Sequence, residues 1–159
     1  MMGKTVAKDE KEAVMWFKRS AAQGFAPGQN RLGECMLYGK GTDENNDEAY
    51  RLFTLSSKQG YARAQKNLGD CMLHGWGCEV DVYGAANNYM RSAEAGDADG
   101  MYGIGYCYRY GYGTGVNYEI ARKWLIQSAE LGNAAAKYEY ALMCFDGIGH
   151  EKNVDEAVR

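Results

Sequence analysis

Apolar residues recur at helical spacing in two kinds of segment along the chain. In the first kind, Ala64, Leu68 and Met72 lie four residues apart on one helical face, and a similar stripe recurs 36 residues earlier and 36 residues later. A second helical segment, around residues 85–93, follows after a turn. Glycines separate the segments, because glycine adopts the positive φ that ends a helix. The pattern predicts repeated pairs of helices, called helix A and helix B here, joined by short turns.

Glycine marks a period of 36 residues without insertion or deletion. A fixed period of this size is typical of a solenoid of stacked repeats. Inside a helix, glycine costs about 1 kcal/mol relative to alanine, so the glycines that recur inside helix A predict a close crossing of helices A and B. The repeated glycines, 15 of the 21 in the chain, occupy positions 24, 60, 96 and 132; 39, 75, 111 and 147; 41, 77, 113 and 149; and, inside helix A, 33, 69 and 105.

Polar residues with N-cap chemistry stand before each predicted helix B. Asn45, Asp81, Asn117 and Asn153 hold the same place in successive repeats. Their side chains can accept a hydrogen bond from a free backbone N–H of the first helical turn. Glu48 and Glu156 follow three residues after the first and the last of them, which is a capping-box pattern.

The composition favours an all-α chain and excludes several classes of protein. The chain has 159 residues and a mass of 17.6 kDa, enough for one domain with its own core. Its formal net charge of −3 argues against a general basic surface for nucleic acid. The longest apolar run, residues 140–145, is too short to cross a membrane. The first ten residues are charged and carry no signal-peptide pattern.

The five cysteines predict free thiols, because their number is odd. Cys35, Cys71 and Cys107 recur at the 36-residue step along successive helices A, whose axes should lie about 8–10 Å apart, too far for routine bridging. We interpret them, and Cys78 and Cys144 as well, as small buried hydrophobic residues, with redox or metal sites as the alternative. Free thiols without a signal-peptide pattern lead us to expect a cytoplasmic location.

Two of the repeats carry a matching set of residues. They are Leu68-Gly69, Gly75-Trp76-Gly77, Asp81, Ala85 and Gly96 in one repeat, and Ile104-Gly105, Tyr108, Gly111-Tyr112-Gly113, Ala121, Trp124 and Ala129 in the next. This set resembles the Sel1-like repeat, a branch of the tetratricopeptide-type helical repeats. The resemblance implies an all-α, right-handed α-solenoid of 36-residue helix-turn-helix repeats. It also implies a protein-protein interaction module, a scaffold or adaptor.

The repeat boundaries predict a single solenoid domain over residues 1–159 that begins and ends inside a repeat. We therefore expect an excerpt of a longer repeat protein with apolar residues uncovered at both ends. These residues favour end-to-end self-association, with simple fraying of the half repeats as the alternative. The expected segments are an orphan helix B at 11–23, repeats at 26–61, 62–97 and 98–133, and a partial repeat at 134–159; the apolar end residues are Met15, Trp16, Phe17, Tyr140, Leu142, Met143 and Phe145.

Little in the sequence indicates catalysis, and we predict no catalytic residues, no metal site and no cofactor. His74 and His150 are the only histidines, and neither has zinc-ligand spacing. The alternative function is a hydrolase, because a cysteine-rich branch of the resembled family has β-lactamase members. The paired cysteines of that branch would fall here on Ser57 and Gln65 and their repeat equivalents, which are not cysteines. Ser-x-x-Lys is also absent.

The resemblance also implies a partner-binding groove, because helix A lines the concave side of tetratricopeptide-type solenoids. Positions two residues before and after Leu32 point away from the core stripe of helix A. We expect a protein or peptide partner there, with no nucleic acid and no membrane insertion. The predicted groove residues are Asn30 and Glu34, then Lys66 and Asp70, then Tyr102, Tyr106, Arg109 and Tyr110, and finally Tyr138.

One repeat stands out in this predicted groove. Tyr102, Tyr106 and Tyr110 form a stripe at steps of four, with Arg109 beside it. Tyrosine and arginine are enriched among interface residues that carry most of the binding energy. The alternative is that these tyrosines pack between repeats. Loss of about 2 kcal/mol of binding energy in Tyr106→Ala, with little change in stability, would support binding.

Overall fold

The computed structural model describes residues 9–149, which form helices and turns. Eight helices and no strand occur in this range. The all-α fold with tandem pairs of helices is therefore confirmed. The chain divides into two compact units, residues 1–80 and residues 81–159, which are called unit 1 and unit 2. The expected grouping of residues 1–159 into one domain stays a prediction.

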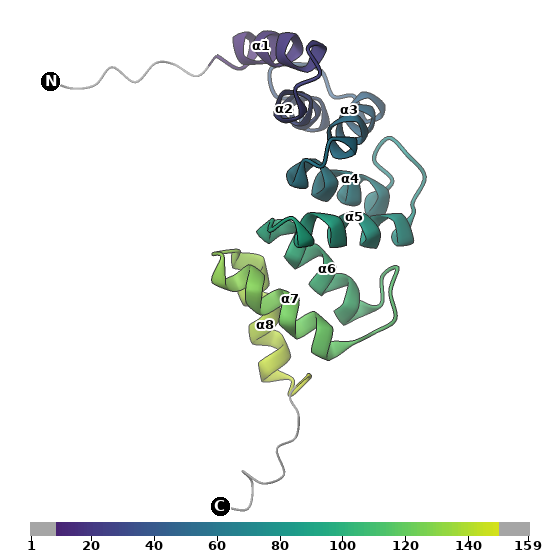
Figure 1. The fold of residues 1–159 in the computed structure, drawn as a ribbon, viewed down its shortest axis with the longest axis vertical. Helices are drawn as coiled ribbons and strands as arrows, with labels where there is room; N and C mark the ends of the chain where they lie inside the picture. Colours follow the sequence, from purple (N-terminus) through teal and green to yellow (C-terminus); the bar gives the residue numbers. More distant parts are fainter. Residues whose placement is uncertain (1–8, 150–159) are drawn as a thin grey trace, which may run out of the picture. The chain divides into compact units, whose positions relative to one another are not determined.

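Unit 1 contains the first four helices (Figure 1). They are α1 (Glu10–Ala22), α2 (Ala26–Leu37), α3 (Asn46–Lys58) and α4 (Ala62–His74). Each helix packs against its neighbour in the chain, and α2 also contacts α4. Helices A of successive repeats are thus in direct contact. The apolar interior comprises Val14, Leu32 and Leu52 in one cluster and Ala49, Phe53, Leu68 and Cys71 in another.

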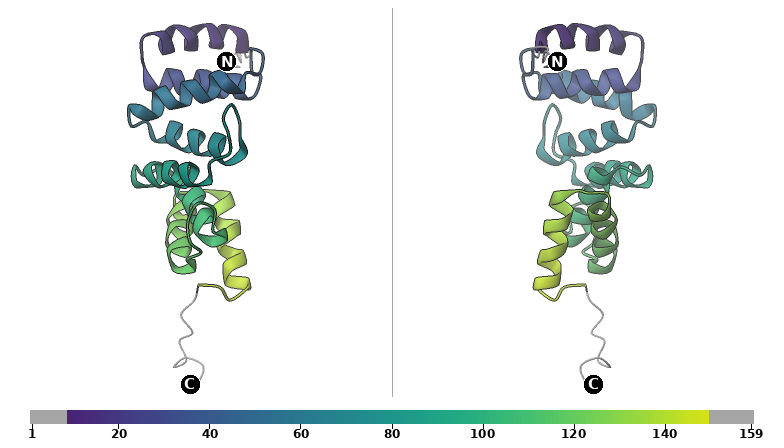
Figure 2. Two further views of the ribbon diagram at one scale, coloured as in Figure 1. Left: turned by 90° about the vertical axis from the view of Figure 1, so that its right-hand side faces the viewer. Right: turned by 90° about the vertical axis from the view of Figure 1, so that its left-hand side faces the viewer.

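Unit 2 repeats this arrangement with the last four helices (Figures 1 and 2). They are α5 (Val82–Glu94), α6 (Ala98–Tyr110), α7 (Tyr118–Glu130) and α8 (Ala134–Phe145). Helix α6 packs against α5 and α7 and also contacts α8. The main core cluster of unit 2 in the described residues comprises Ala121 and Leu125 of α7 and Ala136 and Met143 of α8.

Asn45, Asp81 and Asn117 are N-caps as predicted. The side-chain oxygen of each accepts a hydrogen bond from the backbone N–H three residues later, at 2.9–3.0 Å. Asn153 and Glu156 lie outside the described residues. Only half of the capping box at Glu48 forms: the Glu48 N–H donates to the Asn45 side chain, but the Asn45 N–H donates to the carbonyl of Met36 and not to the Glu48 carboxylate. The Glu48 carboxylate pairs with Arg51 one turn further along α3.

Glycine is required by close backbone contact at the second position of the A–B turn. Gly77 and Gly113 have φ values of +71° and +66°. A Cβ atom on Gly77 would overlap the backbone carbonyl of Asn46, and one on Gly113 would overlap that of Val82. Each turn therefore packs directly on the start of the preceding helix B.

The glycines inside helix A mark close helix crossings. A Cβ atom on Gly33 would lie 2.7 Å from the ring of Phe53, and one on Gly105 would lie 2.9 Å from Leu125 Cγ. Both distances are shorter than real carbon–carbon contacts allow, so the predicted crossing of helices A and B is confirmed at these two positions. Small residues recur at this position of helix A because a larger side chain would clash with helix B.

Candidate functional site

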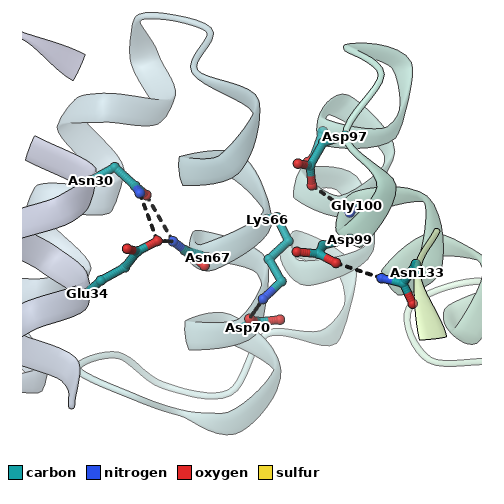
Figure 3. Close-up of polar contacts among 10 residues, drawn as sticks. Asn30, Glu34, Lys66, Asn67, Asp70, Asp97, Asp99, Gly100 and Asn133 are labelled. Atoms are coloured by element: carbon teal, nitrogen blue, oxygen red, sulfur yellow. Dashed lines mark hydrogen bonds and ion pairs between the residues drawn. The ribbon is translucent and has the colours of Figure 1, made fainter. Parts of the chain in front are cut away.

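Two of the predicted groove residues of unit 1, Asn30 and Glu34, belong to a hydrogen-bonded network between α2 and α4 (Figure 3). Asn67 of α4 donates to Asn30 Oδ1 at 2.9 Å and to Glu34 Oε1 at 3.1 Å. Asn30 donates to Glu34 Oε1 at 3.0 Å, and Arg31 donates to Glu34 Oε2 at 2.9 Å. These bonds satisfy both carboxylate oxygens, so the network joins two successive helices A.

Lys66 and Asp70 form a separate ion pair on α4, with Nζ and Oδ2 2.7 Å apart (Figure 3). Their side chains are about one quarter and one fifth exposed. Such a pair at positions i and i+4 contributes only a few tenths of a kcal/mol, about 0.3–0.5. It leaves this part of unit 1 polar and partly exposed.

The corresponding surface of unit 2 is aromatic. The tyrosine cluster, defined here as Tyr102, Tyr106, Tyr110 and Tyr112, has Tyr106 at its centre. The Tyr106 ring centroid lies 6.0 Å from that of Tyr102, 4.5 Å from that of Tyr110 and 6.0 Å from that of Tyr112, whose ring is nearly parallel. Tyr110 and Tyr112 are each 44% exposed. The cluster therefore presents ring area to solvent on a rigid helix and its following turn.

A buried ion pair between Arg109 and Glu139 contacts Tyr110 of this cluster. Arg109 Nη1 donates to Glu139 Oε2 of α8 at 2.5 Å and to the Glu139 carbonyl at 3.0 Å. The Tyr110 hydroxyl donates to the same carboxylate at 3.3 Å, and the Arg109 guanidinium lies 5.0 Å from the Tyr110 ring centroid. Tyr110 is therefore held by both a hydrogen bond and a cation–π contact.

The environment of the cluster raises the pKa of two of its phenols. Partial burial raises the pKa of Tyr106, and the nearby Tyr112 and Glu139 raise it further. Partial burial and the Glu139 carboxylate raise the pKa of Tyr110. Both effects disfavour a phenolate, so the hydroxyls stay protonated and can donate hydrogen bonds.

The structure corrects two of the predicted groove residues. Asn30 is 0% exposed because α4 covers it, and it cannot contact a partner. The Arg109 side chain is only 7% exposed because Glu139 covers it, so it is a supporting residue. Glu34, Lys66, Asp70, Tyr102 and Tyr106 are partly exposed, whereas Tyr110 and Tyr138 are exposed.

Tyr138 stands apart from the tyrosine cluster. It is 64% exposed, and within residues 9–149 no ring contact joins it to the cluster. Tyr102 also differs from its neighbours, because it packs on the apolar cluster around Leu125. The alternative of packing between repeats therefore describes Tyr102, whereas Tyr110 and Tyr112 are equally exposed.

Sequence reasoning missed three residues that build these surfaces. Asn67 and Glu139 occupy the same place in the 36-residue period, and both reach back to the preceding helix A. The available signal was a polar residue directly before the residue aligned with the core position Leu32, at Leu68 and Tyr140. Tyr112 lies in the turn after helix A, between Gly111 and Gly113. The helical pattern therefore gave no indication that its ring contacts Tyr106 and Tyr110.

The cysteines and histidines do not form a reactive site in the described part of the chain. All five cysteines are free. Burial raises the pKa of the Cys71 thiol to about 12 and that of Cys107 to about 11, so both stay protonated. The interpretation of Cys144 as buried is wrong, because it is exposed. No group of three or more metal-ligating side chains occurs within residues 9–149; His150 lies outside this range.

The sequence matches the Sel1 repeat model five times along its length, at residues 1–25, 26–61, 62–97, 98–133 and 134–159. This chain belongs to the Sel1 repeat family. The matches keep the 36-residue step that the glycines show. Sel1 repeat proteins generally serve as protein-interaction scaffolds and are typically not enzymes.

Solved Sel1-type structures resemble this chain. One is c5321, a protective antigen of uropathogenic Escherichia coli strains, with a TM-score of 0.85, 31% identity and coverage of 95% of this chain and 32% of that chain. A Sel1 repeat protein from Oxalobacter formigenes has a TM-score of 0.83, 29% identity and coverage of 96% and 61%. This Sel1 chain thus spans about a third and three fifths of their lengths.

Helicobacter pylori cysteine rich protein B has a TM-score of 0.63 and 23% identity, with coverage of 84% of this chain and 96% of that chain. This similarity extends to the fold alone. No curated protein matches the sequence. None of the helices in residues 9–149 of this Sel1 chain has the length and apolar character needed to cross a bilayer.

Proposed function

We propose that this Sel1 chain binds a protein or peptide segment at the tyrosine cluster of unit 2. The observation that carries the proposal is the run of ring contacts centred on Tyr106, with Tyr110 and Tyr112 open to solvent. Tyrosine rings offer a large contact area and a terminal hydroxyl while ordering only two side-chain torsions. Such side chains frequently carry most of the energy of an interface.

The support beneath the cluster favours binding because it reduces the entropic cost. Glu139 holds the Tyr110 hydroxyl, and Arg109 lies against the Tyr110 ring. A side chain that is already ordered loses less freedom when a partner binds. The raised pKa of Tyr106 also keeps its phenol protonated, so it can donate a hydrogen bond to a partner.

The equivalent surface of unit 1 is a weaker candidate. Glu34 uses both carboxylate oxygens within the chain, and Lys66 pairs with Asp70. A partner would have to replace these bonds and remove water from charged groups, which costs free energy. We therefore place the contact on unit 2.

Selection from a displayed library of random peptides, followed by calorimetry with the selected peptides, tests this proposal. Tyr110→Ala and Tyr106→Ala should each weaken binding by about 2 kcal/mol, which is a roughly thirtyfold increase in Kd. Tyr83→Ala is the matched control, because Tyr83 is 76% exposed on α5 of the same unit and lies outside the cluster.

Equal losses in the control and in the two cluster variants would contradict a site at the cluster. Thermal unfolding of each variant separates binding from stability. If Tyr106→Ala lowers Tm by several degrees and leaves Kd unchanged, Tyr106 is a packing residue and the proposed site is wrong.

A further inference from the structure

The first repeat places a cation on a tyrosine ring at the position where unit 2 carries its tyrosine cluster. Lys40 Nζ lies 5.5 Å from the centroid of the Tyr38 ring, which is a cation–π contact. The equivalent positions two repeats later are Tyr112 and Tyr110. Their ring centroids lie 6.4 Å apart. A second ring in unit 2 thus replaces the cation that the chain itself supplies in unit 1.

The Tyr112 ring is the part of the cluster best placed to receive a cation. It is 44% exposed, and it is nearly parallel to the Tyr106 ring, with an angle of 3° between the two planes. The guanidinium of Arg109 already lies against the Tyr110 ring. Helix α6 contacts α5, α7 and α8, so the cluster follows a helix that has neighbours on both sides in the chain.

The fixed charge next to the cluster is negative. Two carboxylates lie against the Arg109 guanidinium, that of Glu139 at 2.5 Å and that of Asp146 at 3.6 Å, so the three side chains together carry one net negative charge. Partial burial is the main cause that raises the pKa of the Tyr106 and Tyr110 phenols. Between the two charged groups, Glu139 raises both pKa values more than Arg109 lowers them. A positive group is therefore favoured beside these hydroxyls.

We propose that the partner contacts the tyrosine cluster through a positively charged side chain, an arginine or a lysine, which lies against the Tyr112 ring. This inference rests on the proposed function and adds the chemistry of the partner to it. The ring faces attract the cation, and the Glu139 and Asp146 carboxylates add to the attraction. A proline or aliphatic side chain of the partner would gain contact with the rings but nothing from the carboxylates.

The peptides selected from the displayed library test this chemistry directly. We expect them to share an arginine or a lysine. Replacement of that arginine by citrulline, or of that lysine by norleucine, should raise Kd for the full chain about tenfold or more in calorimetry. Citrulline has nearly the shape of arginine but no charge, so the loss reports the charge and not the size of the side chain.

Substitutions at Tyr112 test where the cation lies. Tyr112→Phe keeps the ring and should leave Kd nearly unchanged, whereas Tyr112→Leu keeps apolar volume without a ring and should raise Kd about fivefold or more. Tyr112→Lys copies the Tyr38–Lys40 arrangement into unit 2, so its ammonium should exclude the partner's cation and raise Kd further.

Gln127→Lys is the matched control for the added charge. Gln127 is exposed in the last turns of α7, at the opposite end of this helix from the turn that holds Tyr112. This variant should leave Kd nearly unchanged, and thermal unfolding of every variant checks that unit 2 remains folded.

The outcomes separate this inference from the proposed function. Peptides that need Tyr110 but keep their Kd after loss of their positive charge, or that share a proline or aliphatic anchor, would overturn the inference and leave the proposed function intact. If no selected peptide depends on Tyr110, both are wrong. Equal Kd values for Tyr112→Leu and Tyr112→Phe, or equal losses in Tyr112→Lys and Gln127→Lys, would overturn the contact at Tyr112.

Discussion

Units 1 and 2 use one repeat position for opposite surface chemistry. In unit 1, Asn67 reaches back from α4 and donates hydrogen bonds to Glu34. In unit 2, Glu139 at the equivalent position reaches back from α8 and accepts them from Arg109 and Tyr110. The first contact leaves a polar surface and the second supports a cluster of tyrosine rings.

The framework beneath these surfaces is the same in both units. Ser56 Oγ donates to the carbonyl of Ala26 at 2.7 Å in unit 1, and Ser128 Oγ donates to that of Ala98 at 2.6 Å in unit 2. Each bond joins helix B to the start of the helix A before it. The comparison shows that this bond between helices B and A is kept in both units, while one helix A position changes the chemistry of the exposed face.

Removal of the buried Arg109 guanidinium should produce the largest difference between the units in the free energy of unfolding. Arg109→Leu leaves the Glu139 carboxylate buried without its partner, so the free energy of unfolding should fall by about 3–5 kcal/mol. Urea denaturation measures this loss. Lys66→Ala is the matched variant in unit 1 and should cost less, because the Lys66–Asp70 pair is more exposed than the Arg109–Glu139 pair.

The double variant Arg109→Leu, Glu139→Leu sharpens this result. Removing both charges should recover most of the lost stability, since an apolar pair can replace a buried ion pair. A loss as large as that of Arg109→Leu alone would show that packing, and not the unpaired charge, causes the effect.

Substitution of the turn glycines should affect both units alike. In Gly77→Ala and Gly113→Ala the new Cβ overlaps a backbone carbonyl of the preceding helix B, which adds about 1–3 kcal/mol of overpacking cost. Gly60→Ala and Gly96→Ala are controls with equally positive φ but open space, and should cost only about 1–2 kcal/mol. Equal losses at all four glycines would contradict a close contact between turn and helix.

Alkaline titration should produce a smaller effect that distinguishes the tyrosine cluster. The pKa of Tyr106 and Tyr110 is raised above the ordinary 10.0, so the folded chain holds these protons more tightly than the unfolded chain. Their contribution to stability is therefore present below pH 10 and is lost as the pH rises through 10 toward the folded values. Carbon NMR of the phenol rings should show Tyr106 and Tyr110 titrating above the midpoint of tyrosine in a short unfolded peptide.

The smallest expected effect is on hydrolysis. We predict no turnover of nitrocefin by the chain, because the serine hydroxyls nearest to a hydrolase motif are engaged. Ser56 donates to Ala26 and is fully buried, and Ser57 donates to the carbonyl of Thr54. Turnover that survives Ser56→Ala and Ser57→Ala would place hydrolysis elsewhere on the chain.

The sequence determined the repeat, the helix pairs and their caps, because these depend on local chemistry. Asn45, Asp81 and Asn117 cap helices through contacts three residues away, and the turn glycines need a backbone conformation that few other residues adopt. Because the sequence repeats every 36 residues, the same caps and turns recur along the chain. The bond predicted from the Asn45 N–H to the Glu48 carboxylate does not form, because Arg51, one turn away, pairs with that carboxylate.

Only the tertiary structure decided which helix A positions face solvent. Helical periodicity placed Asn30 and Arg109 away from the core, but the next helix A covers both of them, with Asn67 in one case and Glu139 in the other. A single helix has one predicted core face, whereas a helix A in an array is also covered by its successor. The exposed surface that remains, centred on Tyr110 and Tyr112, follows from contacts between residues about 30 positions apart, as between Tyr110 and Glu139.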